Sequence, residues 1–179
     1  MDTKLNQWTT RSTLSLLIGL LVSLGALVLL DRAFGQADRP WVRHAPAFAL
    51  KNTDGDTVKL DDFAGKTLAV CFVVTSDHPS QKQIAILSDW LKELDPKKFA
   101  VLGLSIEQWG SQTTKAYVEQ EHPRFPFLVA DYETIRAFGG LTAVPTTFII
   151  DKDQNIIQQY VGVTKKEVLE TNSGTASPQ

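Results

Sequence analysis

Beyond residue 44, the hydrophobic positions of the chain fall into short continuous runs and longer helical repeats that follow one another. The two clearest runs, residues 67–74 and 99–106, predict strands that are buried on both faces of a sheet. Between them, apolar residues recur at the spacing of one helical face and predict a helix: Ile84, Leu87, Leu91 and Leu94. Strands that alternate with helices in this way are typical of an α/β fold.

Weaker patterns complete the domain. Short strand patterns at 48–50 and 57–59 flank an Asn-Thr-Asp-Gly turn, which predicts a hairpin because glycine accepts a positive φ. The other predicted elements are a helix at 112–121, a strand at 127–130, a helix at 132–138, strands at 146–150 and 156–161, and a helix from 164. Together they predict a central mixed β-sheet with helices on both faces, in one domain at 44–170 followed by a disordered tail at 171–179.

The N-terminal part of the chain has a different pattern. Residues 14–30 form an apolar run without a charge, long enough to cross a bilayer as a helix. Lys4 and Arg11 precede this run, so the positive-inside rule places residues 1–13 in the cytoplasm. We therefore expect a single-pass anchor in the cytoplasmic membrane, then a linker at 31–43 and a domain outside the membrane, in the periplasm or an equivalent space.

A cleaved signal peptide is the alternative interpretation, with Gly35-Gln36-Ala37 as the small-x-small cleavage site. The apolar run is longer than the roughly 7–15 residues of a usual signal peptide, which favours the uncleaved anchor. Either interpretation exports the domain.

The composition excludes several classes of function. The 18 Lys and Arg residues are balanced by 20 Asp and Glu residues, so the chain has no basic stripe and nucleic acid is not an expected partner. Cys71 is the only cysteine, which excludes an intramolecular disulfide and a closed structural zinc site. The three histidines, His44, His78 and His122, are far apart and lack ligand spacing. We therefore predict no metal and no cofactor.

Two segments carry a resemblance to a known family. Residues 45–50 and 60–66 (APAFAL and LDDFAGK) and residues 144–151 (VPTTFIID) resemble thioredoxin-like proteins of the TlpA/ResA and AhpC/TSA redoxin group. The resemblance implies a thioredoxin-like fold, exchange of thiols and disulfides or peroxidase activity, and for many members a membrane tether. It also implies a cis peptide bond before Pro145, with Val144, Pro145 and Thr146 forming a groove for an extended peptide. The alternative is that the turn itself requires this proline.

The resemblance breaks at the position of the redox site. Alignment of Phe72 and Thr75 with the family pattern places Asp77-His78-Pro79-Ser80 where the family has Cys-x-x-Cys. Thiol–disulfide exchange needs a thiolate that attacks and a second thiol that resolves the mixed disulfide, so this chemistry is not expected here. We predict that Asp77 is a helix N-cap and that His78 is an exposed, uninvolved histidine.

Two functions are the main candidates, and a third, a metal site built from Asp77, His78 and a distant His44 or His122, has no ligand spacing to support it. The first is a non-catalytic binding module that holds an envelope protein or peptide, in a redox, cytochrome or metalloprotein assembly context. The alternative is a thiol-disulfide oxidoreductase or thiol peroxidase-type enzyme acting through Cys71. Cys71 lies inside a predicted buried strand, where burial raises the pKa of a thiol and keeps it inert, so we favour the first.

Overall fold

A computed structural model of the chain describes residues 43–107 and 111–173. The predicted membrane anchor at 14–30 lies outside these residues, as do most of the predicted linker and tail. Within the described ranges, no helix has both the length and the hydrophobicity needed to cross a bilayer.

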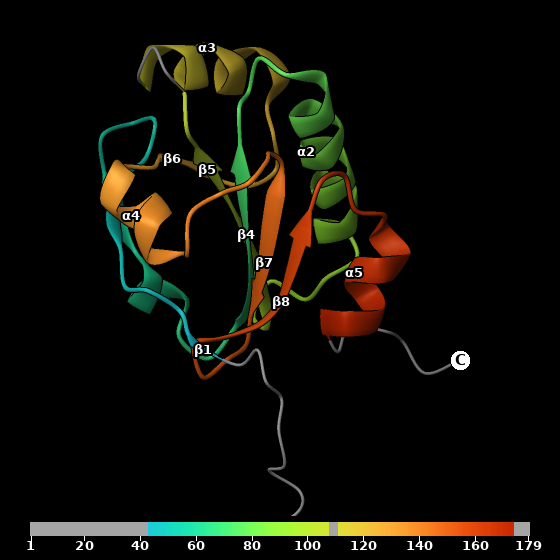
Figure 1. The fold of residues 1–179 in the computed structure, drawn as a ribbon. Coiled ribbons are helices and arrows are strands. Elements are labelled where there is room, and N and C mark those ends of the chain that lie inside the picture. Colours follow the sequence, from blue (N-terminus) through green and yellow to red (C-terminus); the bar gives the residue numbers. More distant parts are fainter. Residues whose placement is uncertain (1–42, 108–110, 174–179) are drawn as a thin grey trace, which may run out of the picture. The chain divides into compact units, whose positions relative to one another are not determined.

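The main sheet is mixed, as predicted, and has the strand order β1-β8-β7-β4-β5-β6 (Figure 1). Strands β4, β5 and β6 are parallel, whereas β7 runs antiparallel to both β4 and β8. The strands are β1 (Arg43–His44), β4 (Thr67–Val73), β5 (Phe99–Ser105), β6 (Phe127–Val129), β7 (Thr146–Ile150) and β8 (Asn155–Val161). With neighbours on both sides, β4 lies inside the sheet, which explains its continuous apolar sequence.

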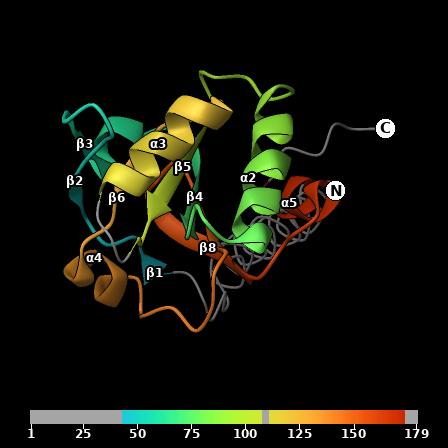
Figure 2. The same cartoon turned by 90° about the horizontal axis from the view of Figure 1, so that it is seen from above.

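Helices cover both faces of this sheet (Figure 1). On one face lie α2 (His78–Leu91) and α5 (Lys166–Ser173). On the other face lie the 3-10 helix η1 (Leu60–Phe63), α4 (Tyr132–Ala137) and the hairpin of β2 (Ala49–Lys51) and β3 (Thr57–Lys59). The last helix, α3 (Ser111–Glu121), lies over the ends of the strands, as the view from above shows (Figure 2). Its residues Tyr117 and Val118 pack against the same cluster of buried residues as α2.

The core has two halves that meet at the sheet. Alternate residues of β4 enter each half: Leu68, Val70 and Phe72 face the hairpin and α4, whereas Ala69, Cys71 and Val73 face α2 and α5. This alternation follows from the period of two along a strand.

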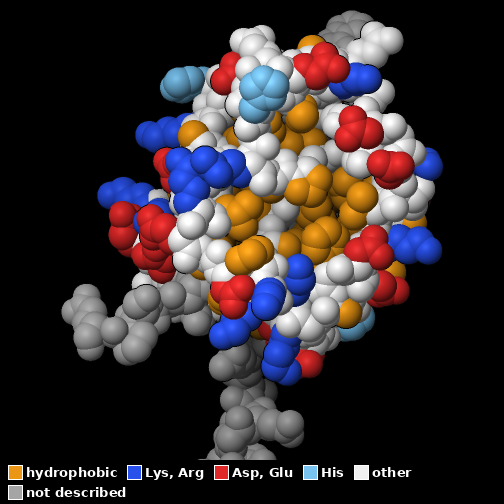
Figure 3. All heavy atoms as spheres, turned by 180° about the vertical axis from the view of Figure 1, so that it is seen from behind, with side chains coloured by type: hydrophobic (Ala, Val, Ile, Leu, Met, Phe, Trp, Pro, Cys, Tyr) orange, Lys and Arg blue, Asp and Glu red, His pale blue; other side chains and the backbone are white. Residues whose placement is uncertain are grey.

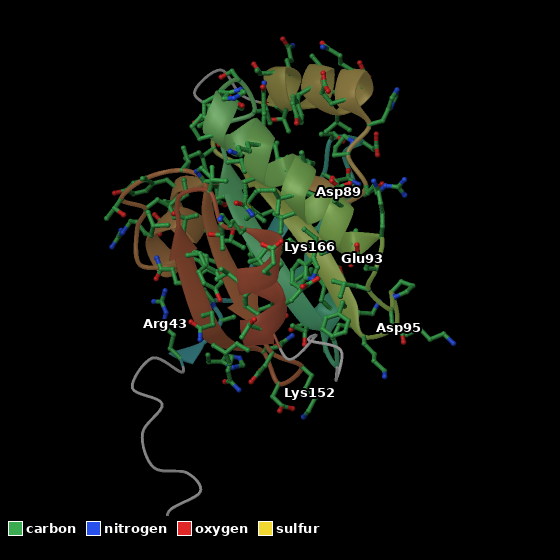
Figure 4. The ribbon with its side chains drawn as sticks, turned by 90° about the vertical axis from the view of Figure 1, so that its right-hand side faces the viewer. Arg43, Asp89, Glu93, Asp95, Lys152 and Lys166 are labelled. Carbon is green, nitrogen blue, oxygen red and sulfur yellow. The ribbon has the colours of Figure 1, made fainter. Side chains whose placement is uncertain are left out.

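Polar contacts fix the helices to the sheet and to one another. The hydroxyl groups of Ser105 and Thr114 are 2.6 Å apart and join β5 to α3 in a buried position. The side-chain oxygen of Gln83 accepts a hydrogen bond of 2.6 Å from the backbone N–H of Thr164, which joins α2 to the segment before α5. Lys166 donates to Glu93, just beyond α2, at 2.5 Å (Figure 4).

Three boundaries differ from the sequence prediction. Residue 43, predicted as the end of the linker, belongs to β1, which pairs with Ile156 and Asn155 of β8. Two residues are too short for a pattern of period two to be visible, and the pairing partner is distant in sequence. Helix α5 extends to Ser173, into the predicted tail, and Ser173 is buried. Helix α2 ends at Leu91, before the last apolar residue of its predicted repeat.

Candidate functional site

The candidate site lies where the ends of three strands meet. The register places Phe72 of β4 opposite Thr146 of β7, and Val73 of β4 opposite Ser105 of β5. The segment after β4, which leads into α2, therefore lies between the segment after β5 and the loop that precedes β7. Asp77 and Pro145, which are distant in sequence, therefore lie in segments at the same end of the sheet.

Asp77 is the N-cap of α2, as predicted. Its backbone is extended, with φ −97° and ψ 143°, and its carboxylate accepts a hydrogen bond of 2.6 Å from the backbone N–H of Ser80. An N-cap of this kind satisfies one of the free N–H groups of the first helical turn, and the helix dipole favours its negative charge. The position that would carry the attacking sulfur in the resembled family therefore holds a structural carboxylate.

Ser80, which the sequence alignment predicts to stand at the second cysteine position of the resembled family, is fully buried. Its hydroxyl oxygen accepts a hydrogen bond of 3.2 Å from the backbone N–H of Val74, the first residue after β4. Ser80 thus joins the first turn of α2 to the end of the strand before it. A hydroxyl at this position satisfies a backbone donor and carries no redox chemistry.

Glu107, which the sequence interpretation did not select, holds the same segment from the side of β5. Its carboxylate accepts from the backbone N–H of Thr75 and, at 2.6 Å, from the Thr75 hydroxyl. Gln81 of α2 donates to the Thr75 carbonyl at 3.0 Å, so the backbone of this buried residue is held on both sides. The signal that could have found Glu107 is its position directly after a strand parallel to β4, because parallel strands end at the same edge.

His78 and Pro79 are exposed in the first turn of α2. Proline is well accommodated there, because the N–H group it lacks would have no partner within the helix. His44, in contrast, lies on β1 and pairs with Asn155. Among the described residues, no group of three or more His, Cys, Asp or Glu side chains is arranged to hold a metal ion.

The loop before β7 has the predicted backbone form, with a cis peptide bond between Val144 and Pro145. Pro145 and Thr146 are buried, Val144 is half-buried, and Ala143 is exposed. The Thr146 hydroxyl donates to the Ala143 carbonyl at 2.7 Å, and the Pro145 carbonyl accepts from the Gly162 N–H at 2.7 Å. A partner at this loop would meet mainly the backbone and the side chains before Pro145. The predicted peptide groove at Val144, Pro145 and Thr146 stays a prediction.

Cys71 lies away from this edge, in the middle of β4. It pairs with Gly103 of β5 and Thr147 of β7, and it is 1 % exposed. The Thr147 hydroxyl donates a hydrogen bond of 3.3 Å to its sulfur. Burial raises the pKa of the Cys71 thiol to about 12, although the hydrogen bond from Thr147 lowers it. A thiol with this pKa stays protonated at physiological pH and is a poor nucleophile.

The fold and the site define a class of protein: a thioredoxin-like domain whose helix N-terminus carries Asp-His-Pro-Ser. The model of the AhpC/TSA family matches residues 42–159, and the chain belongs to that family.

Individual relatives agree with this assignment. The chain is 27% identical over 128 residues to thiol-disulfide oxidoreductase ResA of Bacillus thuringiensis (strain Al Hakam), covering 72% of this chain and 73% of that protein. It is 28% identical over 128 residues to thioredoxin-like protein YneN of Bacillus subtilis (strain 168), covering 70% and 75%. A thiol:disulfide interchange protein of Chlorobium tepidum TLS has a similar structure, with a TM-score of 0.68 and 26% identity over 75% of this chain and 96% of that one.

Proposed function

We propose that this protein is a membrane-tethered redoxin that binds an envelope protein or peptide without catalysing thiol–disulfide exchange. The observation that carries the proposal is the state of the two sulfur positions. Asp77 caps α2, and Ser80 is buried and joined to the end of β4, so both side chains have structural roles at the place where relatives need free sulfur.

The position of Cys71 supports the same conclusion. An enzyme that used this thiol would have to expose the middle of β4, which is paired on both sides. Its raised pKa, about 12, adds a second obstacle because the thiolate is the reactive form.

The loop before β7 supports the binding part of the proposal. Thr142 and Ala143 are exposed in the loop before β7, and exposed main chain of this kind can pair with an extended segment. The apolar run at 14–30, preceded by Lys4 and Arg11, supports a tether that keeps the domain outside the cytoplasm.

The redox part is tested with the full-length chain in detergent, beside a Cys71→Ser variant. Reduction of a disulfide substrate and consumption of peroxide are measured for both proteins. We expect neither protein to be active above buffer. Activity that disappears in Cys71→Ser would overturn the proposal and identify an enzyme that opens its central strand.

The binding part is tested by placing a photo-crosslinking amino acid at Ala143. The matched control carries the same amino acid at Ala137, which is exposed on α4. Irradiation of intact cells is expected to give a defined adduct with one envelope protein from position 143 only. Equal adducts from both positions, or none from 143, would contradict binding at this loop.

A further inference from the structure

One edge of the main sheet is open beside part of β8. On its inner side β8 pairs with β7, but on its outer side β1 pairs only with Asn155 and Ile156. Among the described residues, no strand and no backbone hydrogen bond reaches the outer side of Gln159 or Val161. The edge at β6 differs, because Leu128 is bridged by Asn52. Seen from behind, the side on which β6 lies carries apolar side chains surrounded by charged ones of both signs (Figure 3).

The hydrogen bonds between β7 and β8 show which backbone groups of β8 face outward. Gly162 donates to the Pro145 carbonyl at 2.7 Å, and these two residues lie opposite each other when the register of the two strands is continued. Hydrogen-bonded and non-hydrogen-bonded pairs alternate along an antiparallel ladder. The N–H and C=O groups of Gln159 and Val161 therefore point away from β7, toward the open edge.

This part of β8 lacks the features that usually protect an edge strand. Natural sheets protect their edges with charged side chains, with proline or with a covering segment. Residues 154–164 contain neither a charged residue nor a proline. Gln159 is exposed, Val161 is 54 % exposed, and Val163 just beyond the strand is 39 % exposed. Such an edge is suited to pair with another strand.

We infer that this edge pairs with the same edge of a second copy of the chain. In an antiparallel, two-fold arrangement, Gln159 lies opposite Val161 of the second copy, and the outward groups of both copies form four backbone hydrogen bonds. A strand that meets its own copy places each of its charges near the same charge of the partner, which is unfavourable. The uncharged sequence of β8 avoids this repulsion, so the edge is complementary to itself.

The segment that precedes β1 is a poorer occupant of this edge. In the register that places Arg43 opposite Ile156, Pro40 comes level with Gln159. Proline has no N–H to donate, so the ladder of β1 does not continue there.

The contact between two such edges is small. A pairing of this length buries less than the roughly 1,200 Å² at which specific, stable interfaces begin. We therefore expect a weak dimer that forms at high protein concentration. The inference does not rest on the proposed function.

The test is sedimentation velocity of the full-length chain in detergent over a range of protein concentrations. Wild type is expected to change from monomer to dimer as the concentration rises. Gln159→Lys should weaken the dimer about tenfold, because two cations then lie in one small interface. Addition of Val161→Glu to this variant should restore the dimer, since each new cation then faces a new carboxylate of the other copy.

Two further variants serve as controls. Gln112→Lys adds the same charge at an exposed position of α3 and should leave the dimer unchanged. Gln159→Pro removes an outward N–H and no bond to β7, so it should abolish the dimer while the urea unfolding midpoint stays close to that of wild type.

Several outcomes would overturn the inference. One is a wild-type chain that stays monomeric at every concentration. Another is a dimer that Gln159→Lys leaves unchanged, or weakens no more than Gln112→Lys does, because the contact would then lie elsewhere, such as at the apolar run 14–30. A dimer that the double substitution does not restore would refute the register in which Gln159 faces Val161.

Discussion

Alkaline pH should destabilise this protein through a single buried thiol. Cys71 has its pKa raised from 9.0 to about 12 in the fold, mainly by burial, whereas the unfolded chain exposes the same thiol to water. Between these values the unfolded state loses its proton and the folded state keeps it. The unfolded state then binds fewer protons, so the free energy of unfolding falls as pH rises. The contribution is fully present below about pH 9 and is lost progressively up to about pH 12.

The expected magnitude follows from the same values. Each pH unit within this window changes the free energy of unfolding by about 1.4 kcal/mol. At about pH 10.5, the loss attributable to Cys71 should therefore reach about 2 kcal/mol relative to neutral pH. A change of this size is a substantial part of the roughly 5–15 kcal/mol that stabilises a typical domain.

Urea unfolding of wild type and Cys71→Ala at several pH values isolates this effect. Lysine and tyrosine side chains also titrate above pH 9, but they are common to both proteins and cancel in the difference. The cavity left by the alanine adds an offset that does not vary with pH. Fluorescence of Trp90, which is 1 % exposed, provides a signal for unfolding. A difference that stays flat from about pH 8 to pH 10.5 would refute the burial argument, and a thiol reagent that labels the folded protein quickly would do the same.

Three other substitutions test particular contacts. Asp77→Ala should destabilise the fold by about 0.5–2 kcal/mol in urea unfolding, whereas Asp77→Asn, which can still cap, should lose less stability. Asp131→Ala, at the matching cap of α4, should behave like Asp77→Ala. An unchanged stability in both alanine variants would contradict the capping role. Gly103→Ala should destabilise by about 1–3 kcal/mol, because its Cβ would lie 2.7 Å from the buried ring of Phe127; an unchanged melting temperature would disprove the close approach. Asp77→Cys combined with Ser80→Cys should introduce thiol–disulfide exchange, because the first sulfur would lie at a helix N-terminus. A folded double variant that forms the disulfide but exchanges it with no substrate would show that the two sulfurs alone are not enough for this activity.

The order and type of the elements could be predicted from the sequence because their signals are local. The apolar run at 67–74 predicts a buried strand from its own residues, and β4 lies there. The repeat of Ile84, Leu87 and Leu91 predicts a helix in the same way, and α2 contains it. The N-cap at Asp77 was predictable for the same reason, since its partner is the backbone of Ser80 three residues later.

Contacts between distant segments could not be predicted in this way. Glu107 holds Thr75 because β4 and β5 are parallel and in a particular register, which the amino-acid pattern does not contain. The pairing of Arg43 with Ile156 has the same origin. The contacts that the sequence did not predict therefore depend on tertiary arrangement, whereas the elements and the helix cap that it did predict depend on local sequence.

Asp77 and Ser80, the residues that we predict to stand in place of the two family cysteines, both make structural contacts. Asp77 satisfies an N–H of the first helical turn, and Ser80 satisfies the N–H of Val74 from a fully buried position. A cysteine at either position would be a weaker acceptor, and a buried donor without a partner costs about 1–3 kcal/mol. The double cysteine variant should therefore be less stable than wild type even where it regains exchange chemistry. Selection that acted on stability or binding alone would keep Asp77 and Ser80, whereas selection for redox turnover would remove them.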